Sequence, residues 1–415
     1  MISIKNLFSY LLVFLTMVSV NQWSSLSIGN TFFNWFLSLV IIGIGLWIKR
    51  NYFNPLNKNE YTFVKLYFIW MIIGAIRGMF IAENYWEWKQ WVSGCLALTL
   101  PLFVYVFYKP WLLKKVLKTW LKYAVPIFLL IFLWLLPKGA YHFYLSPILF
   151  LACFFSIIPS KKWRIIFLFL LGLMFVADIS ARSQVIKVII AILISLANPF
   201  YKYVSPKVVR IAFWLLLFLP IVFLFLGISG QFNIFRDLKE NNKNYMAVDN
   251  MNKVDGEKIV SDTRTFIYIE VINSAIKNNY VWLGRTPARG NDSVFFGKQM
   301  GKELGTGKFE RHSNELCFPN IFTWLGVIGM LLYCAIYLKA AYLAMYKSNS
   351  VYMKMAALFI AFHFAYGWVE DFNRFDIMNI SIWMGIAMGF SAEFRNMTNE
   401  EFKLWFISIF SKKNN

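Results

Sequence analysis

The chain has 415 residues, of which 59% are hydrophobic and only 15% are charged, whereas soluble domains average about 25% charged residues. This composition excludes an ordinary soluble protein and indicates a protein that lies in a membrane. The formal charge of +21 does not require a nucleic-acid partner, because most of the excess lies in short segments between apolar stretches. Basic residues in such segments orient membrane helices and contact anionic lipid headgroups, so membrane lipids are the expected partner and nucleic acid is not.

About twelve stretches are apolar enough to cross a bilayer, whose hydrocarbon core of about 30 Å needs roughly 20 residues of helix. They lie near residues 7–22, 31–48, 61–80, 91–108, 121–136, 141–158, 163–179, 182–198, 209–230, 317–339, 351–368 and 376–392. The sequence therefore predicts an all-α integral membrane protein. Its expected parts are nine transmembrane helices in 1–230, a large loop in 231–316, three transmembrane helices in 317–392 and a tail in 393–415.

The orientation of these helices follows from the positions of lysine and arginine, which are enriched in short cytoplasmic loops. If the N-terminus lies in the cytoplasm, the cytoplasmic segments hold 22 Lys and Arg residues, and the short segments on the other side hold four. This asymmetry predicts that both termini are cytoplasmic. The loop over 231–316 is then exported.

The exported loop is the only polar segment longer than about 25 residues, and long loops usually carry function. Within it, "SDTRTFIYIEVINSAIKNNY" predicts an amphipathic helix along the membrane surface, because apolar residues recur at steps of three and four. These residues are Phe266, Ile269, Ile272 and Ile276. Ser261 or Asp262 would cap the N-terminus of this helix, and the glycines and proline of "LGRTPARGND" would end it.

Two arginines are candidates for binding an anion. Arg264 falls in the first turn of the predicted loop helix, where unpaired backbone N–H groups and the helix dipole favour phosphate. Its alternative is an ion pair with Glu270 or Asp262 on a hydrated face. Arg182 stands at the exported end of two apolar stretches, where a charged residue at membrane depth usually has a function or a partner. Its alternative is to extend to the interface and pair with Asp178.

His312 directly precedes the apolar stretch that begins near residue 317. An imidazole can accept a proton at neutral pH, which lysine and arginine cannot do. Its alternative is an ordinary hydrogen-bonded residue of the interface. Arg77 is a further anion-binding candidate or an anchor, and Lys187 lies deep enough to join Arg182. The four cysteines and three histidines show no spacing typical of a metal site, so neither a metal nor a cofactor is expected.

Four motifs together resemble a known family. "ISARS" precedes one apolar stretch, "SDTRTFIYIE" and "NNYVWLGRTP" lie in the loop, and "HSNELCFPNIFTWLGVIG" closes it. Over residues 165–340 this pattern resembles the O-antigen ligase and polymerase superfamily of Gram-negative bacteria, and it is most similar to the ligases. The resemblance implies a GT-C-like membrane fold in the bacterial inner membrane, with the active site on the periplasmic side.

The family pattern falls on Arg182, Arg264, His312 with Ser313, and Gly326 with Gly329. The chain departs from it in two places. Twelve residues, 314–325, separate Ser313 from Gly326 where nine are usual, and Tyr268 stands where leucine is usual.

The resemblance implies that a glycan is transferred from undecaprenyl pyrophosphate to a sugar hydroxyl of lipid A-core, in lipopolysaccharide biosynthesis. Arg182 and Arg264 would bind the pyrophosphate, whose developing charge guanidinium groups stabilise without a metal. His312 would take the proton of the acceptor hydroxyl, and direct displacement would invert the anomeric carbon. A second tier of substrate-binding candidates comprises Arg285, Arg289 and Arg311.

Two other functions remain open at the level of the sequence. An O-antigen polymerase would use the same donor and elongate a second lipid-linked glycan; the histidine near the end of the loop favours the ligase. A transporter or flippase of lipid-linked sugars would perform no chemistry. Transporters usually place charges near the membrane midplane and often show internal repeats, whereas the charges here collect at the exported rim.

Overall fold

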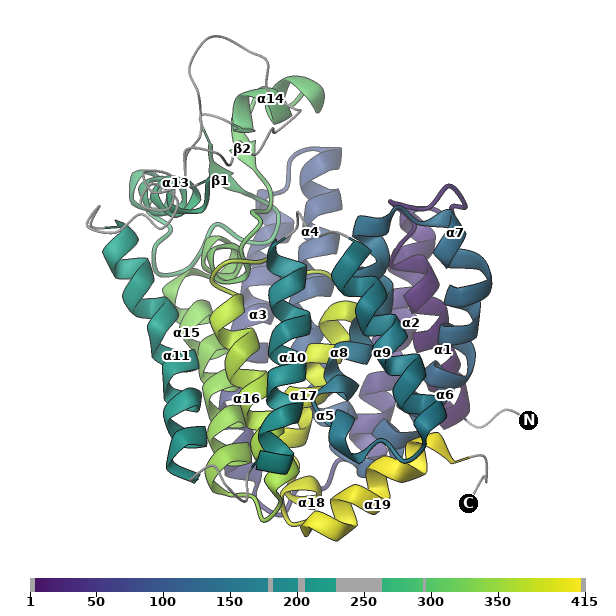
Figure 1. The fold of residues 1–415 in the computed structure, drawn as a ribbon. Coiled ribbons are helices and arrows are strands. Elements are labelled where there is room, and N and C mark those ends of the chain that lie inside the picture. Colours follow the sequence, from purple (N-terminus) through teal and green to yellow (C-terminus); the bar gives the residue numbers. More distant parts are fainter. Residues whose placement is uncertain (1–3, 178–181, 201–205, 229–262, 294–295, 412–415) are drawn as a thin grey trace, which may run out of the picture.

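The computed structural model describes residues 4–177, 182–200, 206–228, 263–293 and 296–411, and the protein is mostly helical, at 77%. The helices stand side by side in one bundle (Figure 1). Its first half contains α1 (Ile4–Val18), α2 (Thr31–Tyr52), α3 (Thr62–Ile81), α4 (Tyr85–Leu98), α5 (Phe103–Val106), α6 (Pro110–Ile127), α7 (Leu133–Leu135), α8 (Tyr141–Ala152), α9 (Lys161–Ala177), α10 (Arg182–Phe200) and α11 (Pro206–Ile228).

The second half begins with α13 (Thr263–Lys277), α14 (Phe296–Glu303) and two short antiparallel strands, β1 (Asn291–Asp292) and β2 (Glu310–Arg311). It continues with α15 (Cys317–Tyr346), α16 (Val351–Tyr366), α17 (Ile377–Phe390), α18 (Ala392–Arg395) and α19 (Asn399–Phe410). The loop helix predicted from the apolar period is present as α13. Its predicted caps, Ser261 and Asp262, lie outside the described residues.

Five helical segments of the described residues are long and apolar enough to cross a membrane: Thr31–Tyr52, Lys58–Ile81, Tyr85–Val106, Pro110–Leu135 and Cys317–Tyr346. The protein therefore has the helical, apolar architecture of a membrane protein. Some boundaries differ from the predicted ones. The stretch predicted over 91–108 divides into α4 and α5 around Pro101, since proline lacks a backbone donor. The tail was expected only as a cytoplasmic segment, but it forms α18 and α19.

The centre of the bundle contains many aromatic side chains. Trp120, Trp324 and Trp383 are among the largest fully buried residues. α15 packs against α3, α16 and α17, and α1 packs against α6. Because α15 lies between so many partners, its loop-side end is fixed from several directions.

The outer faces of several helices are apolar. On α3, Ile69, Ile72 and Ile76 are 57%, 51% and 50% exposed, and Phe80 is 85% exposed. Contiguous exposed apolar surface of this kind is rare on soluble monomers and is typical of contact with lipid. The burial pattern therefore agrees with the composition.

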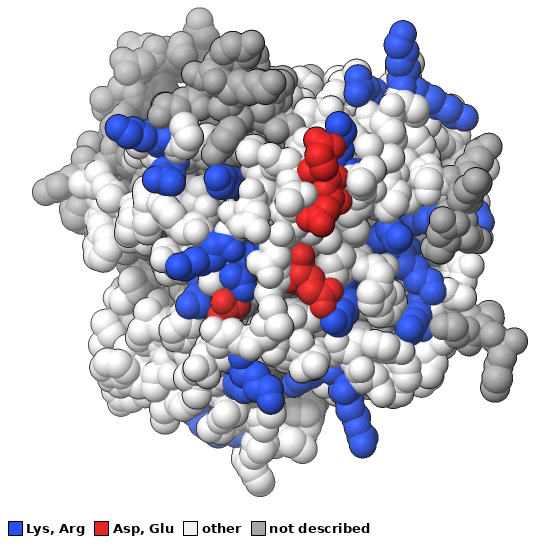
Figure 2. Space-filling view, turned by 90° about the horizontal axis from the view of Figure 1, so that it is seen from below, with Lys and Arg blue, Asp and Glu red and all other residues white. Residues whose placement is uncertain are grey.

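The two ends of the bundle differ. α13, β1, α14 and β2 gather at one end, called the loop end here, whereas α18 and α19 lie across the opposite end, near the start of α1 (Figure 1). The opposite end carries lysine and arginine around its rim, with acidic groups nearer its centre (Figure 2). This distribution is what the positive-inside rule predicts for a cytoplasmic face.

Candidate active site at the loop end

Two adjoining cavities lie at the loop end. The large chamber, of about 800 Å³, is lined by the end of α1, the start of α2, α4 and the turn over 370–376. The small chamber, of about 450 Å³, lies between α4 and α14. Four residues line both chambers and form their common wall: Gln90, Ser93, Arg311 and Ser313. The predicted base His312 lines the small chamber.

The loop is anchored to α15 by two glycines that face each other. Gly284 and Gly326 both have positive φ, 71° and 69°, which side chains rarely adopt. A Cβ atom on Gly326 would lie 2.2 Å from the carbonyl oxygen of Trp282. Glycine at position 326 therefore allows the loop backbone to lie directly against α15.

This close approach interrupts α15 at Gly326, and the interruption leaves carbonyl groups without partners inside the helix. The loop satisfies them. The backbone amide of Arg285 donates to the carbonyl oxygen of Thr323 at 2.7 Å, and that of Thr286 donates to the carbonyl oxygen of Trp324 at 3.1 Å. Because these bonds join backbone to backbone, they fix where the loop enters the site.

Arg77, considered above as an anion-binding candidate or an anchor, belongs to the same attachment. Its Nη1 donates to the carbonyl oxygen of Leu283 at 2.7 Å and its Nη2 to that of Gly284 at 3.2 Å. Two of its five N–H donors are thus bonded to loop carbonyls. The geometry assigns Arg77 the role of an anchor.

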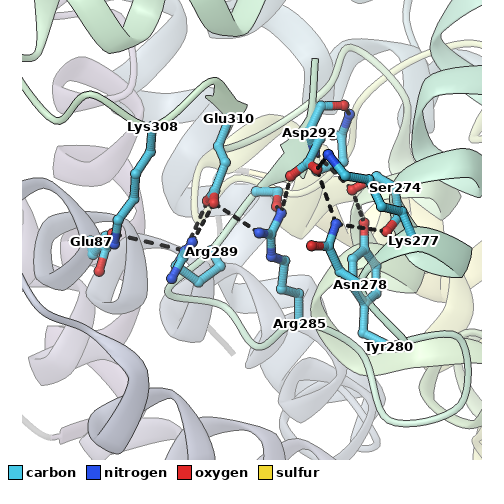
Figure 3. A network of polar contacts seen from close by, with 12 residues as sticks. Glu87, Ser274, Lys277, Asn278, Tyr280, Arg285, Arg289, Asp292, Lys308 and Glu310 are labelled. Carbon is cyan, nitrogen blue, oxygen red and sulfur yellow. Dashed lines mark hydrogen bonds and ion pairs between the residues drawn. The ribbon is translucent and has the colours of Figure 1, made fainter. Parts of the chain in front are cut away.

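A network of charged side chains holds the middle of the loop (Figure 3). Glu310, on β2, is 6% exposed and lies between two guanidinium groups. Arg289 Nε donates to Glu310 at 2.8 Å, and Arg285 Nη2 lies 2.9 Å from Glu310. Arg285 also donates to Asp292, on β1, at 2.6 Å. Burial opposes ionisation of Asp292, but Asn278, Arg285 and its other partners outweigh burial and lower its pKa.

The same network reaches α4. Lys308 Nζ lies 2.6 Å from both Glu83 and Glu87. Glu87 is buried at 1% exposure, and Arg289 lies 3.8 Å from it. Asn84 caps α4 by accepting from the amide of Glu87 at 3.1 Å, which fixes the first turn that carries this carboxylate. The loop is therefore fastened to α4 as well as to α15.

Arg285 and Arg289, predicted as second-tier substrate-binding residues, are thus paired with carboxylates. Removing a guanidinium from such a buried pair leaves an uncompensated charge and is strongly destabilising. These ion pairs explain Arg285 and Arg289 as structural residues, without a bound ligand. The third residue of that tier, Arg311, lies differently.

Arg311 lies in the wall between the chambers. Its guanidinium carbon is 4.3 Å from the ring centroid of Phe296, and its Nη2 lies 3.3 Å from the exposed Glu315. Its Nη1 is buried without a hydrogen-bond partner among the described residues. Arg311 therefore keeps donor capacity beside both chambers, whereas Arg285 and Arg289 line neither.

His312 follows directly on β2. Its carbonyl oxygen accepts from Gln90 Nε2 and from Trp324 Nε1, both at 3.3 Å, so its backbone is tied to α4 and α15. Its ring atom Nδ1 is buried without a hydrogen-bond partner among the described residues. Burial, partly opposed by the Glu310 carboxylate, lowers the pKa of His312 below its ordinary value of 6.5. The imidazole is therefore neutral at pH 7 and is able to accept a proton.

Asparagine side chains hold the segment that follows. Asn320, in the first turn of α15, accepts from the amide of Asn314 at 2.6 Å and donates to the carbonyl oxygen of Asn314 at 2.9 Å. The same amide group donates to Asp371 at 3.2 Å. Burial raises the pKa of Asp371 to about 6. The segment 312–316 is thus linked to the turn over 370–376 on the far side of the large chamber.

The helices that carry the two predicted pyrophosphate-binding arginines both contact residues between α16 and that turn or in the turn itself. On α10, Lys187 is buried and lies 2.5 Å from Glu370. On α13, the hydroxyl group of Tyr268 donates to the carbonyl oxygen of Trp368 at 2.5 Å. α10 begins at Arg182, and Arg264 is the second residue of α13. The side chains of both arginines lie outside the described part of the structure.

Sequence reasoning missed most of the acidic partners. Asp292 and Glu310 become neighbours through the pairing of β1 with β2, and the loop's attachment to α4 brings Glu87 to the same network. Glu370 lies 183 residues from Lys187. The one available signal was a set of carboxylates next to apolar stretches, where a charged residue needs a partner. Among the described residues, no group of three His, Cys, Asp or Glu side chains is positioned to hold a metal ion.

The chain was compared with family models, with curated proteins and with solved structures, and none of them matches it.

Proposed function

We propose that this protein is a glycosyltransferase of the O-antigen ligase type. It moves a glycan from undecaprenyl pyrophosphate to a sugar hydroxyl of lipid A-core. In this proposal twelve helices cross the bacterial inner membrane in a GT-C-like fold, both termini are cytoplasmic, and the loop end is periplasmic. The observation that carries the proposal is His312, a neutral imidazole beside a chamber at the loop end.

The reaction needs a base at the place where the acceptor lies. As the acceptor oxygen attacks the anomeric carbon, His312 takes the hydroxyl proton. The bond from that carbon to the pyrophosphate breaks, and undecaprenyl pyrophosphate leaves with the electron pair. Attack opposite the leaving group inverts the anomeric carbon. General base catalysis of this kind contributes about 10²–10⁴ in rate.

The leaving pyrophosphate needs positive charge on the other side of the anomeric carbon. Arg182 and Arg264 are the proposed groups. Support comes from their helices: Lys187 of α10 pairs with Glu370, which lines the large chamber, and Tyr268 of α13 bonds to Trp368, two residues earlier in the chain. Arg311 and Arg374 also line this chamber. Each charge-assisted hydrogen bond contributes about 1.5–3 kcal/mol. The donor therefore occupies the large chamber in this proposal.

The test uses the full-length protein in lipid nanodiscs with undecaprenyl-linked donor and rough lipopolysaccharide, without ATP and with EDTA. We expect a ladder of glycan-bearing lipopolysaccharide. The substitutions His312→Ala and His312→Gln should each lower kcat/KM by about 10²–10⁴. Arg182→Ala and Arg264→Ala should each lower it at least tenfold, because each removes one charge-assisted bond.

The matched control is Arg50→Ala, because Arg50 is an exposed arginine in the last turn of α2, outside both chambers. It should leave the rate unchanged. Unaltered activity of His312→Ala would remove the proposed base. A product that grows only on the lipid carrier would identify a polymerase instead.

A further inference from the structure

The charges lining the two chambers are divided unequally. The large chamber is lined by four carboxylates, those of Glu315, Glu370, Asp371 and Asp376, and by two guanidinium groups, those of Arg311 and Arg374. Among the described residues that line the small chamber none is Asp or Glu, and its charged residues are Lys89 and Arg311. An anionic group on an acceptor is therefore attracted to the small chamber, whereas the pyrophosphate of the donor relies on the arginines of the large one.

The small chamber also has the surface that a sugar ring needs. Trp86 and Phe296 line it, together with Met300 and Leu304. Aromatic faces accept the apolar faces of a sugar ring, and few placed polar groups then fix its orientation. Lys89 Nζ lies over the Trp86 ring at 4.9 Å from its centroid, which places a cation over one face of this platform.

We propose that the small chamber is the acceptor subsite and that it takes a sugar bearing a phosphate or carboxylate group. This inference rests on the proposed function, because it places the acceptor hydroxyl next to His312 and the donor across the wall in the large chamber. Lys89 binds the anionic group, Trp86 and Phe296 hold the ring, and Arg311 stands between acceptor and donor.

The test measures binding without donor, so that it is independent of transfer. The full-length protein is titrated with glucose 6-phosphate, glucuronate and glucose, and dissociation constants are measured by saturation-transfer NMR. Loss of one charge-assisted contact costs about tenfold in affinity. We expect at least one charged sugar to bind about tenfold more tightly than glucose, and the two charged probes distinguish a phosphate from a carboxylate.

The variant Lys89→Gln should abolish this preference. The matched control Lys302→Gln should retain it, because Lys302 is an exposed lysine of α14 outside the chamber lining. Equal binding of charged and neutral sugars to the unmodified protein would overturn the inference, and so would equal effects of the two lysine variants.

The two proposals fail in different ways. If the protein transfers the glycan but shows no Lys89-dependent preference for charged sugars, the proposed function stands and the proposed subsite is wrong. If the protein shows the Lys89-dependent preference but transfers no glycan, the proposed subsite stands and the proposed function is wrong.

Discussion

Replacing Gly326 by alanine should detach the loop from α15. The added Cβ would lie 2.2 Å from Trp282 O and 2.6 Å from Gly284 N, and both are backbone atoms that no rotamer change moves away. Retaining the conformation costs about 1–3 kcal/mol of backbone strain. Releasing the loop instead loses three hydrogen bonds, from the amides of Arg285, Thr286 and Val327, at about 0.5–1.5 kcal/mol each.

Either route costs on the order of 3 kcal/mol, which corresponds to about a hundredfold change in an opening equilibrium. Hydrogen exchange followed by mass spectrometry should therefore show about hundredfold faster exchange in peptides covering residues 281–286. Gly43→Ala is the control, because a Cβ there meets nothing within 4 Å. It should stabilise α2 by about 0.5–1 kcal/mol through helix propensity. Equal exchange of the loop in both variants would refute the assigned role of Gly326.

Two further predictions concern charged groups of the site. Since the pKa of His312 is lowered, the neutral, basic form of its imidazole persists to lower pH. A plot of kcat/KM against pH should therefore rise to an inflection below 6.5 and stay level from pH 7 to 8. An inflection above 6.5 would contradict this. Glu310→Gln should destabilise the protein by about 3–5 kcal/mol, because it breaks a buried pair, and should lower its melting temperature. Glu315→Gln, at an exposed pair, should leave that temperature nearly unchanged, and equal shifts would rule out the proposed difference.

The sequence predicted those features of the fold that depend on residues close together in the chain. The apolar steps around Ile269 predicted α13, and the apolar stretches predicted where helices lie. The kink at Gly326 was not predicted, because a Gly-x-x-Gly pattern is also compatible with close packing of two helices. Only the loop backbone over 281–286, which lies 40 to 45 residues earlier in the chain, determines that α15 is interrupted there.

The site was predictable only in part, for a similar reason. His312 and the chain position of Arg311 followed from a short motif next to an apolar stretch. The pairing of Arg285 and Arg289 did not, because an arginine in a glycine-rich loop has the same local sequence whether it binds a ligand or a buried carboxylate. Lys89 was not predicted as a site residue, because a single lysine near the start of a helix gives no signal in the sequence. Its position becomes informative only in the structure, where it lines the small chamber.

The attachment of the loop also sets an order of events during synthesis. Glu87 is made 221 residues before Lys308, and Arg77 is made 206 residues before the carbonyl group of Leu283. Until translation reaches those partners, the carboxylate of Glu87 and the guanidinium of Arg77 lack these contacts. We therefore expect nascent chains that end before residue 283 to expose both charges and to be sensitive to proteases, and we expect the finished protein to become resistant once this loop has docked on α4 and α15.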